Sequence, residues 1–289
     1  MGMPYAEVIG DPIAHSKSPL IHNFWLAKLG LNYEYRRTRV TPGQLPAYLD
    51  AARGDPFWCG ANVTIPLKRT VASLMDELVY PAPSIGAVNA VVRKGSEQPV
   101  LVGHNTDADG FLAPLNGWPG LDRNIRMASL IGTGGAAAAV AWALRREGFL
   151  LFVYSRSLER AAAFLRELGE DDMDFAQRLD GLAAGPAIGT DWGDRSEVAD
   201  LLVNASPLGM AGGLPLAVDL DGLPPDTLVY DLVYDPVETP LLATARERGL
   251  PTISGLDMLV GQAAVAFELF FAQPAPRAHD AELMALLAR

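Results

Sequence analysis

The sequence predicts an α/β protein with parallel sheets and two domains, and three observations support this prediction. Short apolar or alternating runs recur between helical patterns, which is typical of strand–helix–strand units. The length of 289 residues is enough for two domains. A composition of 49% hydrophobic and 20% charged residues is that of a globular protein, so disordered, collagen-like and disulfide-rich classes are excluded.

The strands are expected where apolar runs are bounded by turn residues. In chain order they cover 6–10, 33–40, 60–63, 87–93, 127–131, 150–154, 201–204, 228–232 and 252–254. The last long helix is expected over 256–272. Residues 169–197 are acidic and weakly periodic, so a solvated connection with one helix at most is expected there. No segment recurs at a fixed period, which excludes solenoids and propellers.

Two other helices have a recognisable start, an N-cap residue followed by proline. Ser18 with Pro19 begins one of them, and Thr239 with Pro240 begins the other. Gly30 is expected to end the first of these helices.

The charge balance limits the kinds of partner. Lys and Arg number 23 against 34 Asp and Glu, a net charge of −11 that makes nucleic acid and anionic membranes poor partners. Cys59 is the only cysteine, so no internal disulfide is possible, and the histidines show no zinc-ligand spacing. The start of the chain has no basic residue before Lys17, and the apolar runs are too short to span a membrane. We expect a cytoplasmic protein without a metal, in which any anionic ligand needs a locally basic or amide-rich pocket.

A dinucleotide-binding motif occupies residues 130–144, LIGTGGAAAAVAWAL. Gly132 allows a tight turn, and Gly134 lets the backbone approach a pyrophosphate at the helix N-terminus. The alternative is a plain glycine turn before an alanine-rich core helix. The strand–turn–helix context, followed by a second strand, favours a Rossmann domain. The cofactor contacts expected here are Gly132, Thr133, Gly134, Gly135 and Ala136.

The residues after the second strand of this domain predict which cofactor is bound. NAD enzymes place an acidic residue there to hold the ribose hydroxyls, whereas this chain has Ser155, Arg156 and Ser157, with Arg160 one turn further. A guanidinium can bind a 2′-phosphate with two hydrogen bonds, and the hydroxyls add donors. We therefore expect NADP, with NAD as a weaker alternative. The competing interpretation is that these arginines only solvate a helix start.

Six further blocks of the chain carry polar residues that a plain core would not need. They are GDPIAHSKSPLIHN (10–23), GANVTIPLK (60–68), GAVN (86–89), GHNTDADG (103–110), YDLVYDPVETPL (230–241) and GLDMLVGQAAVAFE (255–268). In this order around GTGGAAAA they closely resemble the shikimate dehydrogenase family over essentially the whole chain.

The resemblance implies an N-terminal α/β substrate-binding domain and a Rossmann NADP-binding domain, with the active site in the cleft between them. It places the first domain at 1–106 and 256–289 and the second at 107–255. The implied reaction is the reversible, NADP-dependent reduction of 3-dehydroshikimate to shikimate, a step towards chorismate and the aromatic amino acids.

The resemblance also implies a role for each matching residue. The catalytic pair is Lys68 and Asp107, both within reach of substrate hydroxyls. The remaining substrate contacts are Ser16 and Ser18 at the carboxylate, Tyr234 near it, and Asn62, Thr64, Asn89 and Gln262 at the ring hydroxyls. The backbone at Ala205, Leu232 and Gly255 is implied to line the nicotinamide pocket.

These roles also make chemical sense. Two hydroxyls just before a helix form a small anion site, and although Ser18 also suits an N-cap, Ser16 has no capping duty to explain it. Neutral amides and hydroxyls can orient a polyhydroxylated acid, although each alone would be an ordinary turn residue. Lys68 can donate to the ketone oxygen, but it could also be a solvated lysine at a helix start. Because a nearby carboxylate favours the charged lysine, we treat Lys68 and Asp107 as one coupled unit.

Two departures from the family pattern leave alternatives open. Ala90 stands where the family usually has threonine, which removes a hydroxyl next to Asn89, and Ser155-Arg156-Ser157 replaces a commoner Asn-Arg-Thr. A quinate/shikimate or aminoshikimate dehydrogenase with relaxed use of NAD is therefore a second hypothesis. A third is a regulator that binds shikimate and NADP without turnover, which retention of both members of the catalytic pair disfavours. The chain is expected to act as a monomer or homodimer.

Overall fold

A computed structural model describes residues 2–169, 175–186, 188 and 198–289. The chain divides into two compact units: the first comprises Met1–Gly110 and Leu259–Arg289, and the second comprises Phe111–Met258. The first unit therefore extends past the expected boundary at 106 and includes Asp107. Within the described residues, no helix is both long and apolar enough to cross a bilayer.

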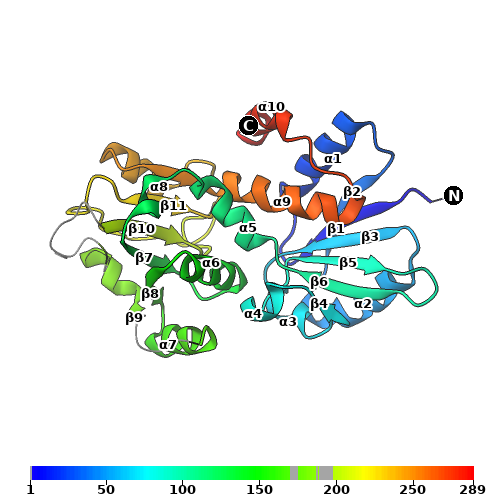
Figure 1. The fold of residues 1–289 in the computed structure, drawn as a ribbon, viewed down its shortest axis with the longest axis horizontal. Coiled ribbons are helices and arrows are strands. Elements are labelled where there is room, and N and C mark those ends of the chain that lie inside the picture. The colour runs from blue at the N-terminus through cyan, green and yellow to red at the C-terminus, as the bar shows by residue number, and fades with distance from the viewer. Residues whose placement is uncertain (1, 170–174, 187, 189–197) are drawn as a thin grey trace. The chain divides into compact units, whose positions relative to one another are not determined.

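The first unit is built on a six-stranded sheet with the order β2-β1-β3-β5-β6-β4. Its strands are β1 (Tyr5–Gly10), β2 (Glu34–Arg39), β3 (Trp58–Val63), β4 (Glu77–Leu78), β5 (Ala90–Lys94) and β6 (Val100–His104). Its helices are α1 (Ser18–Leu29), α2 (Leu45–Gly54), α3 (Lys68–Ala72), α4 (Ala82–Ile85) and α10 (Asp280–Leu287), with 3-10 turns at Pro42–Gln44 and Arg277–His279. The helices α5 (Asp107–Leu112) and α9 (Gly255–Phe271) each contain a point where the chain passes from one unit to the other (Figure 1).

The two faces of this sheet are buried by different helices. Ile9, Ala61 and Val63 form one core with apolar residues of α2, such as Leu45 and Leu49. The opposite face carries Gly60, where an added Cβ would lie 2.6 Å from the Phe270 ring of α9. On that face Trp25 of α1 packs edge-on against Phe267 of α9, with ring centroids 5.6 Å apart. Helix α9 is thus part of the core of the first unit.

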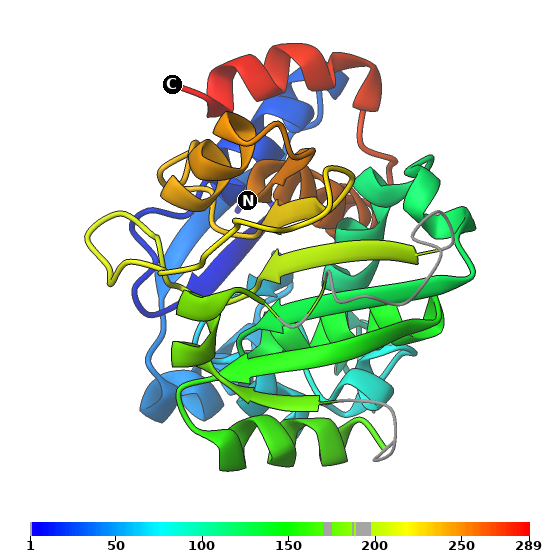
Figure 2. The same cartoon turned by 90° about the vertical axis from the view of Figure 1, so that its left-hand side faces the viewer.

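The second unit contains a six-stranded parallel sheet with the order β12-β11-β10-β7-β8-β9, whose strands run in colour from green through yellow to orange in Figure 2. Its strands are β7 (Ile125–Ile131), β8 (Phe149–Ser155), β9 (Phe175–Arg178), β10 (Val198–Asn204), β11 (Leu228–Asp231) and β12 (Thr252–Ser254). Its helices are α6 (Gly135–Arg146), α7 (Leu158–Glu167) and α8 (Pro240–Glu247), with 3-10 turns at Ala113–Leu115, Pro119–Asp122 and Leu179–Ala184.

Local signals placed most of the elements correctly. Thr239 caps α8 as expected, since its hydroxyl accepts from the Leu242 backbone N–H at 3.2 Å. Gly30 ends α1 in the left-handed conformation with φ 64°, which glycine adopts without strain. The expected N-cap at Ser18 is wrong by one position: Lys17 is the N-cap, and Ser18 is already helical.

Other differences concern strands whose signals are weak or non-local. The expected strand 87–93 begins only at Ala90, and β5 is antiparallel to both β3 and β6, so the first sheet is mixed and not parallel throughout. The strands β4 and β6 and the terminal helix α10 were not expected. Within 169–197 the described part contains β9 and a 3-10 turn, and residues 170–174, 187 and 189–197 of that acidic segment lie outside the described residues.

Candidate active site

The centre of the candidate active site is an ion pair between Lys68 and Asp107. These are the first residues of α3 and α5, and both belong to the first unit. Lys68 Nζ lies 2.5 Å from Asp107 Oδ2, and the two side chains are only 14% and 4% exposed. Charges so far removed from water are tolerated because each neutralises the other, so loss of one leaves the other buried without a partner.

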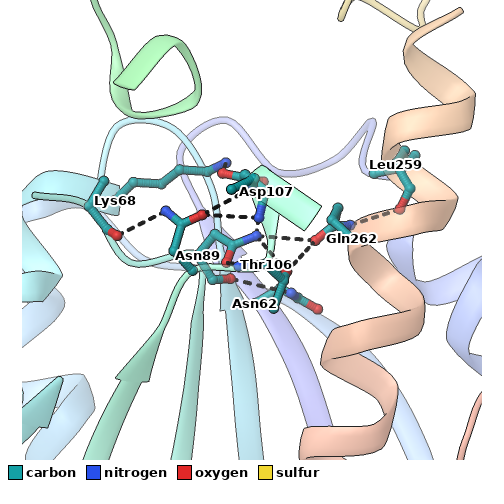
Figure 3. A network of polar contacts seen from close by, with 10 residues as sticks. Asn62, Lys68, Asn89, Thr106, Asp107, Leu259 and Gln262 are labelled. Carbon is teal, nitrogen blue, oxygen red and sulfur yellow. Dashed lines mark hydrogen bonds and ion pairs between the residues drawn. The ribbon is translucent and has the colours of Figure 1, made fainter. Parts of the chain in front are cut away.

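Asn89 connects this pair to the surrounding polar residues (Figure 3). Its Nδ2 lies 2.9 Å from Asp107 Oδ1, 2.9 Å from Thr106 Oγ1 and 3.3 Å from Gln262 Oε1. Its Oδ1 accepts from the Thr106 backbone N–H at 2.7 Å. The carboxylate of Asp107 is therefore held by Lys68 on one oxygen and by Asn89 on the other.

Gln262 reaches this cluster from α9. Its Nε2 donates to the Leu259 carbonyl at 2.9 Å, which leaves Oε1 directed at Asn89 and Thr106. Gly110 permits this approach, because a Cβ there would lie 2.6 Å from both the Cβ and the backbone nitrogen of Gln262. Gln262 thus lies in the helix expected over 256–272, and its side chain contacts Asn89 and Thr106 of the same unit.

Asn62 and Thr64 stand at the end of β3. Asn62 is 4% exposed, and its Nδ2 donates to the Asn89 carbonyl at 3.3 Å. Thr64 directly follows the strand and packs against Gly10, where an added Cβ would lie 2.5 Å from Thr64 Cγ2. Gly10 therefore has to lack a side chain for Thr64 to occupy this position.

Ala90, the departure from the family pattern, lies in the same row of the sheet as Asn62. It pairs with Asn62 on β3 and with His104 on β6. Cross-strand partners project from the same face, so a threonine at this position would place its hydroxyl beside Asn62. The substitution thus changes the surroundings of Asn62 as well as those of Asn89.

The Ser16–Ser18 turn differs from the prediction in one respect. Ser16 Oγ accepts from the Ser18 backbone N–H at 3.3 Å, so Ser16 does have a role in starting the helix. Arg37 Nε donates to the Ser16 carbonyl at 3.0 Å and thereby brings a cationic group to this turn. Both serines are buried, at 9% and 5% exposure. Their predicted contact with a carboxylate remains a prediction.

Two residues next to Asp107 were not singled out from the sequence. Asn105 Oδ1 accepts from the Asp107 backbone N–H at 3.0 Å, and its Nδ2 donates to the Ala87 carbonyl at 2.9 Å, so it fixes the start of α5. Thr106 supplies the hydroxyl shared with Asn89 and Gln262. An asparagine shortly before an acidic first turn is a capping signal, and it could have identified Asn105.

In the second unit, the glycine turn has the geometry that a pyrophosphate requires. Gly132 has φ 116°, and a Cβ there would lie 3.0 Å from the Ala205 carbonyl oxygen. Gly134 is the N-cap of α6 and has no side chain to bind the first-turn amides. Such amides, together with the helix dipole, favour an anion. Thr133, Gly135 and Ala136 continue this turn into the helix, and the set therefore fits a dinucleotide cofactor.

The four residues predicted to bind a 2′-phosphate lie at the junction of β8 and α7. Arg156 and Arg160 are exposed, whereas Ser155 is 8% exposed. Ser157 is the N-cap of α7: its Oγ accepts from the Arg160 backbone N–H at 3.3 Å and donates to Glu159 at 2.5 Å. The Ser157 proton is thus already used within the protein, and its donation to a phosphate stays a prediction.

A buried carboxylate organises the segments that carry the predicted nicotinamide contacts. Asp231 Oδ1 accepts from Asn204 Nδ2 at 2.9 Å and from the Val233 backbone N–H at 3.0 Å, and Oδ2 accepts from the Thr239 hydroxyl at 2.6 Å. Burial raises the pKa of Asp231. Ala205 and Leu232 directly follow Asn204 and Asp231 in sequence.

Gly255 has to lack a side chain, because a Cβ there would lie 2.4 Å from the Leu232 carbonyl oxygen. Tyr234 is half-buried after β11, in the second unit. Its predicted place near the substrate carboxylate remains a prediction. Among the described residues, no cluster of three or more His, Cys, Asp or Glu side chains is arranged to hold a metal ion.

Comparison with known proteins identifies the relatives of this chain. Residues 8–91 match the family model of the shikimate dehydrogenase substrate binding domain, and residues 255–284 match that of the shikimate 5'-dehydrogenase C-terminal domain. A shikimate dehydrogenase (NADP(+)) of Sphingopyxis alaskensis is 48% identical over 98% of this chain and 97% of its own length.

Two solved structures have the same fold over nearly the whole chain. Shikimate 5-dehydrogenase from Thermus thermophilus in complex with NADP(H) and shikimate has a TM-score of 0.80 and 33% identity, covering 99% of this chain and 100% of its own. Quinate dehydrogenase from Corynebacterium glutamicum in complex with NAD has a TM-score of 0.81 and 31% identity, covering 98% and 99%. The resemblance found in the sequence motifs is confirmed: this chain belongs to the shikimate dehydrogenase family.

Proposed function

We propose that this chain catalyses the reversible, NADP-dependent reduction of 3-dehydroshikimate to shikimate. The observation that carries this proposal is the buried Lys68–Asp107 pair, held in place by Asn89. A protein that only sensed its ligands would have no need for an ammonium and a carboxylate coupled in this way. Relatives named as NADP-dependent shikimate dehydrogenases support the same activity.

The substrate is bound by neutral amide and hydroxyl groups around this pair. Ser16 and Ser18 hold its carboxylate, with Arg37 adding positive charge close to that turn. The ring hydroxyls contact Asn62, Thr64, Asn89 and Gln262, and Tyr234 lies near the carboxylate end. Such a set rejects analogues that lack a hydroxyl, because a buried amide would then lose its partner.

The cofactor is held through backbone amides and arginines of the second unit. The pyrophosphate lies on the turn Gly132–Ala136, and Arg156 and Arg160 bind the 2′-phosphate, with Ser155 as an additional donor. The backbone at Ala205, Leu232 and Gly255 lines the nicotinamide. When bound, the cofactor supplies or accepts the hydride at the carbinol carbon.

The protein's chemical task is to move a proton at the carbinol oxygen. In the reducing direction Lys68 Nζ donates to this oxygen as negative charge develops on it. Asp107 fixes the direction of Nζ, and Asn89 in turn fixes Asp107. In the oxidising direction the same pair takes the proton back.

The direct test is to mix purified protein with shikimate and NADP and to follow the absorbance of the reduced nicotinamide. Formation of reduced cofactor is the expected result. A correctly folded protein that binds NADP but forms no reduced cofactor would exclude the proposed activity.

We further infer that the partners are small molecules, not nucleic acid or membrane, that the enzyme is cytoplasmic, and that it acts as a monomer or homodimer.

A second candidate is the oxidation of quinate or aminoshikimate, with NAD accepted as well as NADP. Two observations favour this breadth: the similarity to a quinate dehydrogenase in complex with NAD, and the Ser157 hydroxyl that is bound to Glu159. A panel of the three acids, each with both cofactors, separates the candidates through their specificity constants. The first proposal expects the highest value for shikimate with NADP.

A further inference from the structure

Tyr35 forms a hydrogen bond with a predicted substrate residue that lies two strands away. Its hydroxyl donates to Asn62 Oδ1 at 2.6 Å, although β1 separates β2 from β3. The strand register pairs Tyr35 with Ala6, and Ala6 with Gly60. Asn62 lies two residues after Gly60 on β3 and therefore projects from the same face of the sheet. Because Ala6 and Gly60 carry little or no side chain, the tyrosine ring can cross over β1 to reach Asn62.

Helix α1 holds the other parts of Tyr35. The side chain of Asn23 donates to the Tyr35 carbonyl at 2.8 Å and accepts from its backbone N–H at 3.0 Å. The adjacent His22 stacks on the tyrosine ring, with centroids 4.0 Å apart and planes 2° apart. Tyr35 itself is 2% exposed. Its backbone, ring and hydroxyl are therefore each held by a different neighbour, and the hydroxyl has a defined position.

These contacts determine which way the Asn62 amide points. Asn62 Nδ2 faces the Asn89 carbonyl, which can only accept, so the nitrogen must lie on that side. The Oδ1 then faces Tyr35, whose hydroxyl keeps its proton because burial raises the pKa of Tyr35 well above its usual value. Ala90, in the row beside Asn62, has no side-chain group that could form a hydrogen bond.

We propose that Tyr35 is a positioning residue that fixes the polarity of Asn62, so that the amide presents its second N–H to the substrate. The substrate oxygen bound there then acts as an acceptor. This inference rests on the proposed function, which assigns Asn62 to the substrate. Without the phenol, Oδ1 loses the hydrogen bond that Tyr35 donates, and the amide can turn and place an oxygen where the substrate needs a donor.

The kinetic test compares Tyr35→Phe with Tyr48→Phe. Tyr48 is a suitable control, because it is a half-buried tyrosine of the first unit whose hydroxyl donates to Glu7 at 2.8 Å, on the opposite face of the sheet. Tyr35→Phe should raise the KM for shikimate by about three- to tenfold, with a smaller change in kcat and none in the KM for NADP. Tyr48→Phe should leave all three unchanged.

A double-mutant cycle and a measurement without substrate complete the test. In an Asn62→Ala background, Tyr35→Phe should cause no further rise in KM, whereas fully additive effects would overturn the inference. The side-chain amide signals of Asn62 in NMR spectra, assigned through their loss in Asn62→Ala, should shift and broaden in Tyr35→Phe but not in Tyr48→Phe.

The kinetic and the NMR measurements together distinguish the inference from the function on which it rests. If the wild-type protein does not turn over shikimate and Tyr35→Phe still moves the Asn62 signals, the proposed function fails and the positioning of Asn62 stands. If the wild-type protein is active and Tyr35→Phe changes neither the KM nor the signals, the function stands and the inference is wrong.

Discussion

At the scale of single residues, Lys68 is the group whose removal separates binding from chemistry. Lys68→Met keeps an unbranched side chain only one atom shorter but removes the ammonium group that supplies the proton, so we expect kcat to fall by about 10²- to 10⁴-fold. Shikimate binding, measured by calorimetry, should weaken far less. Arg69→Met on the same short helix is the control, and it should leave kcat nearly unchanged. An active Lys68→Met protein would contradict the assigned proton transfer.

Arg156 is expected to determine the choice of cofactor. Its exposed guanidinium follows Ser155 at the end of β8, where a 2′-phosphate would lie. Arg156→Ala should weaken NADP binding by about 10- to 100-fold and NAD binding by much less. Dissociation constants from fluorescence titration measure both. Arg166→Ala, at the far end of α7, is the matched control, and an equal loss of both cofactors in Arg156→Ala would contradict recognition of the phosphate.

At the scale of elements, Asp231 connects the ends of β10 and β11 to the start of α8 and has an unusual effect on stability. Its pKa is raised by burial above the value of 3.8 that applies in the unfolded chain. Between these two pKa values the folded state binds more protons, so the free energy of unfolding falls as the pH rises through that window.

Asp231→Asn can keep the three hydrogen bonds, with its oxygen towards Asn204 and Val233 and its nitrogen towards Thr239. We therefore expect the stability of this variant to decline less than that of the wild type as the pH rises above 3.8. Urea unfolding at a series of pH values measures the difference. Asp226→Asn changes an exposed carboxyl of the same unit and should follow the wild-type profile.

The helices, strands and turns also differ in how well they could be predicted from the sequence. The turn at Gly132, the cap at Thr239 and the end of α1 at Gly30 follow from residues next to one another in the chain, and all three were found. The antiparallel β5 was not, because apolar periodicity indicates a strand but not its direction. The start of α1 was missed by one residue because Ser16, and not Ser18, accepts the hydrogen bond there.

The residues of the candidate site were predicted better than the residues that hold them in place. The motifs identified Lys68, Asn89, Asp107 and Gln262, which the structure brings together. Tyr35 was overlooked because its contact with Asn62 depends on the strand order β2-β1-β3, which no local pattern reveals. The double use of Ser157 as cap of α7 and as partner of Glu159 was also overlooked, because its hydroxyl was assigned to the phosphate.

At the scale of the whole molecule, the chain returns to its first unit after completing the second. Hydrogen exchange should show this division in the intact protein. Shikimate alone should slow exchange in peptides that cover Asn62, Asn89 and Gln262, and NADP alone should slow it in peptides that cover Gly132 and Arg156. Mass spectrometry of digested samples resolves these regions. If peptides containing Gln262 responded to NADP and not to shikimate, the division of binding tasks between the units would be wrong.

The cluster around Asn89 has a consequence for the ligand's own hydroxyl groups. Three oxygens lie within hydrogen-bond distance of Asn89 Nδ2, which carries only two hydrogens. Nδ2 therefore cannot donate a separate hydrogen to each of the three oxygens. The oxygen with the longest contacts is Gln262 Oε1, at 3.3 Å from Asn89 and 3.4 Å from Thr106. A ligand O–H that donates to Gln262 would relieve this local shortage of hydrogens. Neighbouring hydroxyls of one ring would then be distinguished by polarity, one giving its hydrogen to Gln262 and another receiving one from Asn62.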